Sequence, residues 1–102
     1  MKFVKYIIAL SFIISFQLNA QWVQTNGPYG GYLRSLAVSG TNLFAGTWGG
    51  GVFLSTNNGT NWTPVSSGLT NTRVQSLVVS GTNLFAGTWG GGVFRSTDNG
   101  AN

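Results

Sequence analysis

The chain of 102 residues contains no cysteine, no histidine and no glutamate, and Asp98 carries its one carboxylate side chain. Without histidine or cysteine it can build neither a Cys/His metal site nor a Ser-His-Asp or Cys-His nucleophile. A glycosidase that uses two carboxylates cannot be assembled within one copy of the chain either. The composition therefore excludes much enzyme chemistry, and we expect neither a metal nor a cofactor.

The net charge of +4 belongs in part to the N-terminus, where Lys2 and Lys5 stand in front of an apolar run over residues 6–16. A basic start, an apolar run of about ten residues and a small residue at the end are typical of a secretory signal peptide. We predict a signal-peptide helix over residues 1–20, cleavage after Ala20, and export to the periplasm or the outside of the cell. The alternative is a membrane anchor, but a spanning helix needs about 20 apolar residues.

After removal of the signal peptide, three arginines (Arg34, Arg73 and Arg95) stand against Asp98. Nucleic-acid binding depends on basic residues that together neutralise several phosphates. Three scattered arginines make no such stripe, so we expect no nucleic-acid partner, and no membrane association once the leader is removed.

A long internal repeat occupies most of the remaining chain. Residues 39–53 recur unchanged as residues 80–94, a period of 41 residues. The comparison extends over residues 39–61 and 80–102, and only three of these 23 aligned positions differ. A fixed period of this length is the signature of a repeat array or a propeller.

Within each period, short runs rich in Val, Phe, Leu, Trp and Thr alternate with turns rich in glycine and asparagine, which indicates strands and hairpins. The first repeat predicts strands at residues 34–39, 42–48, 51–56 and 61–65, joined by turns at 40–41, 49–50 and 57–60. Four antiparallel strands in about 40 residues describe one blade of a β-propeller. We therefore expect an all-β chain without helices after residue 20.

The predicted organisation is two blades' worth of propeller after the signal peptide. An outer strand and a linker occupy residues 21–33, blade 1 occupies residues 34–74, and blade 2 occupies residues 75–102 without its fourth strand. The triple glycines in each repeat are hairpin turns rather than a phosphate cradle, because no lysine or helix follows them.

The turns at the end of the third strands also resemble a known motif. Residues 55–62 read Ser-Thr-Asn-Asn-Gly-Thr-Asn-Trp, and residues 96–102 read Ser-Thr-Asp-Asn-Gly-Ala-Asn. Both resemble the Asp box of the bacterial neuraminidase repeat, Ser-x-Asp-x-Gly-x-x-Trp, with Asn57 replacing the aspartate in the first. In that family the hairpin joins the third and fourth strands of a propeller blade, and the resemblance covers residues 34–102.

The motif residues have a structural role by their chemistry: Ser55, Asn57, Gly59 and Trp62 in the first hairpin, and Ser96, Asp98 and Gly100 in the second. An Asx side chain can accept hydrogen bonds from backbone N–H groups two residues on, and glycine adopts positive φ at little cost. We expect Trp62 to pack over its hairpin. A catalytic acid is the weaker interpretation of Asp98, because Asn57 fills the same place in the first repeat.

Proteins similar to this chain include sialidases, xyloglucan-degrading glycosidases, sortilin-type receptor ectodomains and photosystem assembly factors. The sialidase site uses an arginine triad, an acidic residue and a Tyr/Glu pair from particular blades, and none of these roles carries over to this chain. The resemblance implies a non-catalytic binding or scaffold module for a glycan or an extracellular protein. The alternative is the N-terminal fragment of a propeller glycoside hydrolase whose catalytic residues lie outside this chain, for which fold analogy is the only warrant.

Up-and-down topology predicts that the turn between the second and third strands shares one rim with the linker to the next blade. This rim carries the candidate ligand-binding residues Trp48, Trp89, Arg34 and Arg73. The two tryptophans can stack on sugar rings or grip a peptide, since aromatic residues are favoured contact residues. The alternative, which we favour, is that they pack between neighbouring blades.

Two blades' worth is short of the 4–8 blades that typically close a propeller. The favoured explanation is that the chain is the N-terminal piece of a longer protein, with the strand at residues 21–24 completing a final blade. The other is a self-complementary unit, whose opening strand completes the last blade of a neighbouring copy in a closed homo-oligomer.

Overall fold

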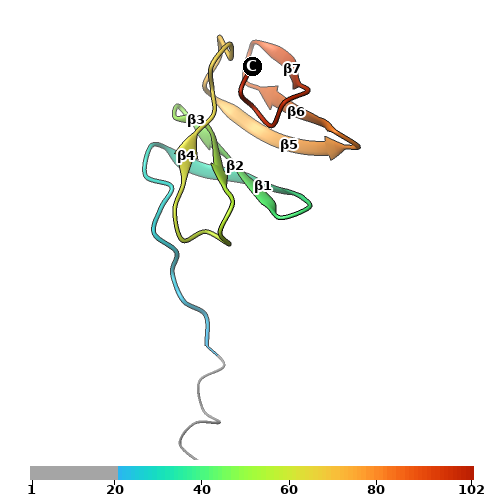
Figure 1. Ribbon diagram of the computed structural model, residues 1–102. Helices are drawn as coiled ribbons and strands as arrows, with labels where there is room; N and C mark the ends of the chain where they lie inside the picture. Colours follow the sequence, from blue (N-terminus) through green and yellow to red (C-terminus); the bar gives the residue numbers. More distant parts are fainter. Residues whose placement is uncertain (1–20) are drawn as a thin grey trace, which may run out of the picture.

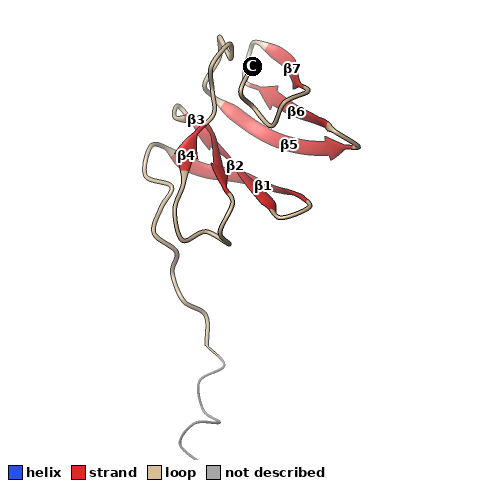
Figure 2. Ribbon diagram, viewed as in Figure 1, coloured by secondary structure: helices blue, strands red, loops and turns tan. Residues whose placement is uncertain are grey.

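The computed structural model describes residues 21–102, and the predicted signal peptide lies outside these residues (Figure 1). The described part of the chain is all-β, with two antiparallel sheets and no helix (Figure 2). Consequently, residues 21–102 contain no helix long and apolar enough to cross a membrane.

The first sheet has the strand order β1-β2-β3-β4 and the second the order β5-β6-β7. The strands are β1 (Tyr32–Ser39), β2 (Asn42–Trp48), β3 (Gly51–Ser55), β4 (Thr63–Pro64), β5 (Val74–Ser80), β6 (Asn83–Thr88) and β7 (Gly92–Ser96). The sequence thus correctly predicted that the chain after residue 20 is all-β, and it predicted the order of the strands along the chain.

Three strands differ from the prediction at their ends. β1 begins at Tyr32 rather than residue 34, and β3 ends at Ser55 rather than residue 56. β4 is shorter than the predicted strand at residues 61–65. It starts late because the N–H of Asn61 donates to Oδ1 of Asn57 in the preceding hairpin, at 2.9 Å, instead of pairing with β3. Residues 21–24 pair with no strand of the described chain, so the outer strand expected there stays a prediction.

The glycine turn between β2 and β3 is a tight hairpin, as the sequence predicted. Gly49 and Gly51 have φ values of 100° and 77°, a region that glycine reaches without the penalty of a Cβ atom. The hydroxyl of buried Thr47 donates to the Gly51 carbonyl at 2.9 Å and closes the turn. Thr88 makes the same contact with Gly92 in the second sheet, at 2.8 Å.

The core lies between the two sheets. β5 lies against β1 and β2 of the first sheet (Figure 1). The buried residues at this contact are Phe44 and Val52 from the first sheet and Val74, Leu77, Leu84 and Ala86 from the second. Fully burying a Val, Leu or Phe side chain stabilises a fold by about 1.5–3 kcal/mol, so the interface between the sheets contributes substantially to stability.

Gly46 allows the two sheets to approach closely. A Cβ atom at this position would lie 2.8 Å from Cγ1 of Val74 and 3.2 Å from Cγ of Leu77. Beside it, the N–H of Leu77 donates to Oγ of Ser35 at 3.0 Å, a hydrogen bond from one sheet to the other. The glycine and the small serine therefore set the spacing of the sheets.

The segment before β1 covers the part of the other face of the first sheet that lies over Phe53 of β3. A Cβ at Gly30 would lie 3.0 Å from the ring of Phe53, and one at Gly31 would lie 2.7 Å from the Trp48 carbonyl. Thr25 lies further along the same sheet, with its Cγ2 at 2.9 Å from a Cβ built at Gly59. The chain from residue 25 to β1 thus packs on the first sheet without forming a strand.

Replacing Gly46 with alanine tests the close approach of the sheets. We expect Gly46→Ala to lower the free energy of unfolding in urea by about 1–3 kcal/mol, because the new methyl group overpacks the contact with Val74 and Leu77. The matched control, measured on dilute monomeric protein, is Gly87→Ala one period later, where the added Cβ within one chain meets mainly the rotatable hydroxyl of Ser76. Equal losses of stability in the two variants would contradict this account of the core.

Candidate functional site

The linker between the sheets returns to the β2–β3 turn, as the topology predicted. The carbonyl of Thr72 accepts hydrogen bonds from the N–H groups of Gly49 at 2.9 Å and Gly51 at 3.0 Å. The next residue, Arg73, forms an isolated antiparallel bridge with Trp48. The first sheet and the start of the second are therefore joined by backbone hydrogen bonds at this end.

All four residues predicted for the ligand rim come together here, and we call Arg34, Trp48, Arg73 and Trp89 the rim cluster. The guanidinium carbon of Arg34 lies 5.2 Å from the centre of the Trp48 ring, and that of Arg73 lies 5.7 Å from it. The rings of Trp48 and Trp89 are 5.8 Å apart between centres and tilted by 55°. Trp48 is thus the centre of a contact that draws on both sheets.

Two backbone irregularities place the arginines beside Trp48. The pairing of β1 with β2 shifts between Leu33 and Ser35, which leaves Arg34 as the extra residue of a β-bulge. A bulge turns the side chain of its extra residue away from the regular alternation of the strand. Arg73 precedes β5 and is held by its bridge to Trp48, so the two arginines reach one ring from non-equivalent positions of the repeat.

Asn71 positions the linker, and the sequence analysis gave it no role. Its side-chain Nδ2 donates to the Trp89 carbonyl at 2.9 Å, while its Oδ1 accepts from the N–H of Arg73 at 3.0 Å. One side chain therefore connects the backbones of two cluster residues. The available signal was an asparagine two residues before an arginine in a polar linker, a pattern that asparagine uses to brace turns.

The two tryptophans of the rim cluster differ in exposure, and this suits them to different roles: packing for Trp48 and contact with a ligand for Trp89. Trp48 is half-buried and contacts Trp89 across the sheets, which is the packing between neighbouring repeats that the sequence favoured. Trp89 nevertheless keeps 58% of its surface exposed, and both arginines are exposed. A packed Trp48 with an open Trp89 leaves an aromatic surface beside two cations.

No acidic side chain of the described residues lies beside the two arginines at this end of the sheets. The chain has a single carboxylate, Asp98, which lies in the hairpin after β7, whereas Trp89 lies at the opposite end of that strand. An arginine near an aromatic ring gains about 0.5–1 kcal/mol at an exposed site, and its guanidinium can still donate paired hydrogen bonds to a carboxylate or sulfate. The cluster can therefore stack on an apolar ring face and hold an anionic group.

The two hairpins that resemble Asp boxes have the same hydrogen bonds. In the first, Oγ of Ser55 donates to Oδ1 of Asn57 at 3.0 Å and accepts from the N–H of Gly59 at 2.8 Å. In the second, Oγ of Ser96 donates to Oδ1 of Asp98 and accepts from the N–H of Gly100, both at 2.8 Å. The serine and the Asx side chain therefore close both loops in the same way.

One detail of the predicted hairpin is wrong. The Asx oxygen accepts from the backbone N–H four residues on, not two: Asn61 donates to Asn57, and Asn102 to Asp98, each at 2.9 Å. The N–H two residues on instead belongs to Gly59 or Gly100, which bonds to the serine. A loop of this width needs two residues with positive φ, and the asparagine before each glycine supplies the second.

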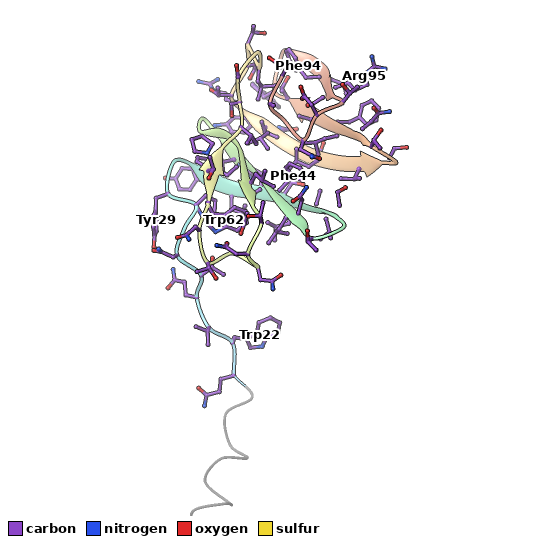
Figure 3. All side chains as sticks on the ribbon, in the orientation of Figure 1. Trp22, Tyr29, Phe44, Trp62, Phe94 and Arg95 are labelled. Carbon is purple, nitrogen blue, oxygen red and sulfur yellow. The ribbon has the colours of Figure 1, made fainter. Side chains whose placement is uncertain are left out.

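Trp62 packs back against its hairpin. Its ring lies 3.7 Å from a Cβ built at Gly59 and 3.4 Å from one built at Gly27, so it fills the space between the hairpin and the N-terminal segment (Figure 3). The indole nitrogen is buried and has no hydrogen-bond partner among residues 21–102. This contact is structural and lies away from the rim cluster.

Hydrogen bonding lowers the pKa of the Asp98 carboxyl below its ordinary value. The largest cause is the hydroxyl of Ser96, followed by the backbone N–H of Asn102, and both stabilise the carboxylate. A carboxyl with a lowered pKa stays ionised at neutral pH and cannot serve as a general acid there.

A cleft between the sheets is too small to hold a glycan or a peptide. Its free volume is about 60 Å³, and Val52, Leu69 and Phe94 are among the residues that line it. This volume holds at most a few water molecules. A larger ligand has to bind elsewhere, at an open surface such as the rim cluster or the groove of about 480 Å³ between residues 23–26 and 58–61. Within residues 21–102 no three His, Cys, Asp or Glu side chains gather where a metal ion could bind.

Comparison of the chain with protein-family models, with curated proteins and with solved structures found no match.

Acid titration distinguishes the two hairpins. The stabilisation from Asp98 is complete above the ordinary pKa of 3.8 and is lost as the pH falls through the lower pKa of the folded chain. In NMR spectra, we expect the side-chain carboxyl carbon of Asp98 to titrate with a midpoint below 3.8, while the side-chain carbonyl carbon of Asn57 does not respond. Asp98→Asn should remove this titration from the second hairpin. A midpoint at or above the ordinary value would contradict the hydrogen bonding described here.

Proposed function

We propose that the chain is a segment of an exported Asp-box β-propeller and acts as a non-catalytic module that binds a glycan or an extracellular protein at the rim cluster. The repeated hairpins support the propeller, since both loops use the same serine, Asx and glycine contacts. The packing of one repeat on the next through an inner strand supports it as well, because blades of a propeller pack face to face around a centre.

The observation that carries the binding function is the contact of Arg34 and Arg73 with Trp48 beside the exposed ring of Trp89. Tryptophan and arginine are the residues most often found at the energetic centres of interfaces. Here they are presented at a sheet end by a bulge, a bridge and a bracing asparagine rather than by a loose loop. Ligand binding would therefore require little ordering of the protein.

The position of Asp98 supports the proposal of a non-catalytic role. Its carboxylate is engaged by Ser96 and Asn102, and the hairpin that contains it lies at the opposite end of its sheet from Trp89. The rim cluster itself offers no general acid or base of the usual kind, because it contains no carboxyl, imidazole or thiol group. Recognition without bond cleavage is the chemistry that these residues support.

Affinity electrophoresis in native gels tests this function, with alginate and xyloglucan as carbohydrate probes and poly-L-glutamate and casein as polypeptide probes. We expect at least one probe to retard the protein, and Trp89→Ala and Arg73→Ala each to weaken that binding by about tenfold or more. The matched control is Arg95→Ala, which removes an exposed arginine of β7 that does not belong to the cluster. Retardation that survives Trp89→Ala, or that Arg95→Ala weakens equally, would overturn the assignment.

A further inference from the structure

The contact between the two sheets uses one face of each. The first sheet contributes the face with Phe44, Gly46 and Val52, which we call the acceptor face. The second sheet contributes the face with Val74 and Leu77, which we call the inserting face. Because the acceptor face and the inserting face consist of different residues, the contact joins unlike surfaces and is head-to-tail.

Each sheet also has a free face, and the residues on it correspond, one period away, to the face that the other sheet uses in this contact. One period after the acceptor face, the second sheet carries Phe85, Gly87 and Val93. This second acceptor face is open: Val93 is 73% exposed, whereas its counterpart Val52 is 3% exposed. A Cβ built at Gly87 meets Oγ of Ser76 in its own sheet and no residue of a covering sheet.

The first sheet likewise repeats the inserting face. Leu33 and Leu36 stand one period before Val74 and Leu77. Their exposed fractions are 53% and 55%, whereas Val74 and Leu77 are 0% and 7% exposed. The chain thus displays an open acceptor face at one end and open inserting residues at the other. Phe85, Gly87 and Val93 are the same residue types as the acceptor residues of the internal contact, and the inserting pair differs by a leucine at residue 33 where the internal contact has Val74.

The N-terminal segment contacts the first sheet's hairpin in the same way as Val65, the residue after β4, contacts the second sheet's hairpin. Thr25 lies against Gly59, and Val65 lies against Gly100, each with a methyl carbon 2.9 Å from the built Cβ. Trp22 precedes Thr25 by the same three residues as Trp62 precedes Val65. Trp22 is fully exposed, at 103%, and extends away from both sheets in Figure 3. Residues 22–25 therefore have the place of a fourth strand that belongs to a preceding sheet.

We propose that a second copy of this chain docks head-to-tail on the open acceptor face and adds its residues 22–25 to β7 as a fourth strand. Leu33 and Leu36 of the second copy cover Gly87, and the N–H of its Leu36 donates to Oγ of Ser76, as Leu77 does to Ser35. The β3–β4 register pairs Phe53 with Pro64 and Leu54 with Thr63. Transferred to the new contact, it pairs Phe94 with Gln24 and Arg95 with Val23 of the second copy.

The second copy fits because the contact needs no new chemistry. The glycine, the serine acceptor and the apolar residues recur at the spacing that already packs the two sheets within the chain. Each docked copy presents another open acceptor face, so a head-to-tail contact continues to a ring or a filament. The inference is independent of the rim cluster and of the ligand that binds there.

Two variants, each with one of the two faces blocked, test the proposal. The measurement is analytical ultracentrifugation of the protein that an expression host has exported. We expect the wild type to form assemblies larger than a dimer as its concentration rises. Val78→Arg puts a charge on the acceptor face, at the counterpart of Ala37, which packs against the core within the chain. Leu36→Arg does the same on the inserting face. Each variant alone should associate more than about a hundredfold less tightly, because an unpaired charge would be buried.

Mixing the variants is the decisive step. The intact acceptor face of Leu36→Arg should take the intact inserting face of Val78→Arg, and assembly should stop at a one-to-one dimer. Thr82→Arg, in the exposed turn after β5, is the control that leaves wild-type association intact. Trp22→Ala lies outside both sheets and should weaken association by about tenfold without affecting the fold. A wild type that stays monomeric, blocked variants that still self-associate, or a mixture that stays monomeric overturns the proposal.

Discussion

The close approach of β5 to the first sheet at Gly46 is the constraint on which the other features depend. Because no Cβ separates the sheets, Val74 and Leu77 reach the buried surface of Phe44 and Val52. The same approach leads the chain past the β2–β3 turn, where Thr72 accepts two hydrogen bonds and Arg73 bridges Trp48. Packing in the core and assembly of the rim cluster are thus consequences of one glycine contact.

The hairpins solve a separate problem, which is to close a wide loop with side chains instead of strand pairing. A serine hydroxyl and an Asx oxygen satisfy the backbone N–H groups that the loop turns inward, so these groups are not left without partners. Asparagine and aspartate do this equally well in the two repeats, which explains why the one carboxylate of the chain has a structural role. Its lowered pKa comes from the bonds that hold the loop, and it requires no catalytic function.

The sequence predicted the strand class, the strand order and the meeting of the four rim residues, because the period of 41 residues and the glycine turns leave few alternatives. It did not predict the early end of the β3–β4 pairing, since this depends on the N–H of Asn61 bonding to Asn57. It also missed Asn71, whose bonds to Trp89 and Arg73 form only when two sheets are in place. Local patterns thus define the strands, whereas contacts between the sheets define the site.

The central claim is that packing over Gly46 assembles the rim cluster, and exciton-coupled circular dichroism of the Trp48 and Trp89 indoles tests it most directly. Two rings 5.8 Å apart and tilted by 55° should give a couplet. We predict that it disappears in Trp48→Phe and in Trp89→Phe, weakens in Gly46→Ala, and is unchanged in Trp22→Phe. A couplet that persists without Trp89, or that Gly46→Ala leaves at full strength, would contradict the account.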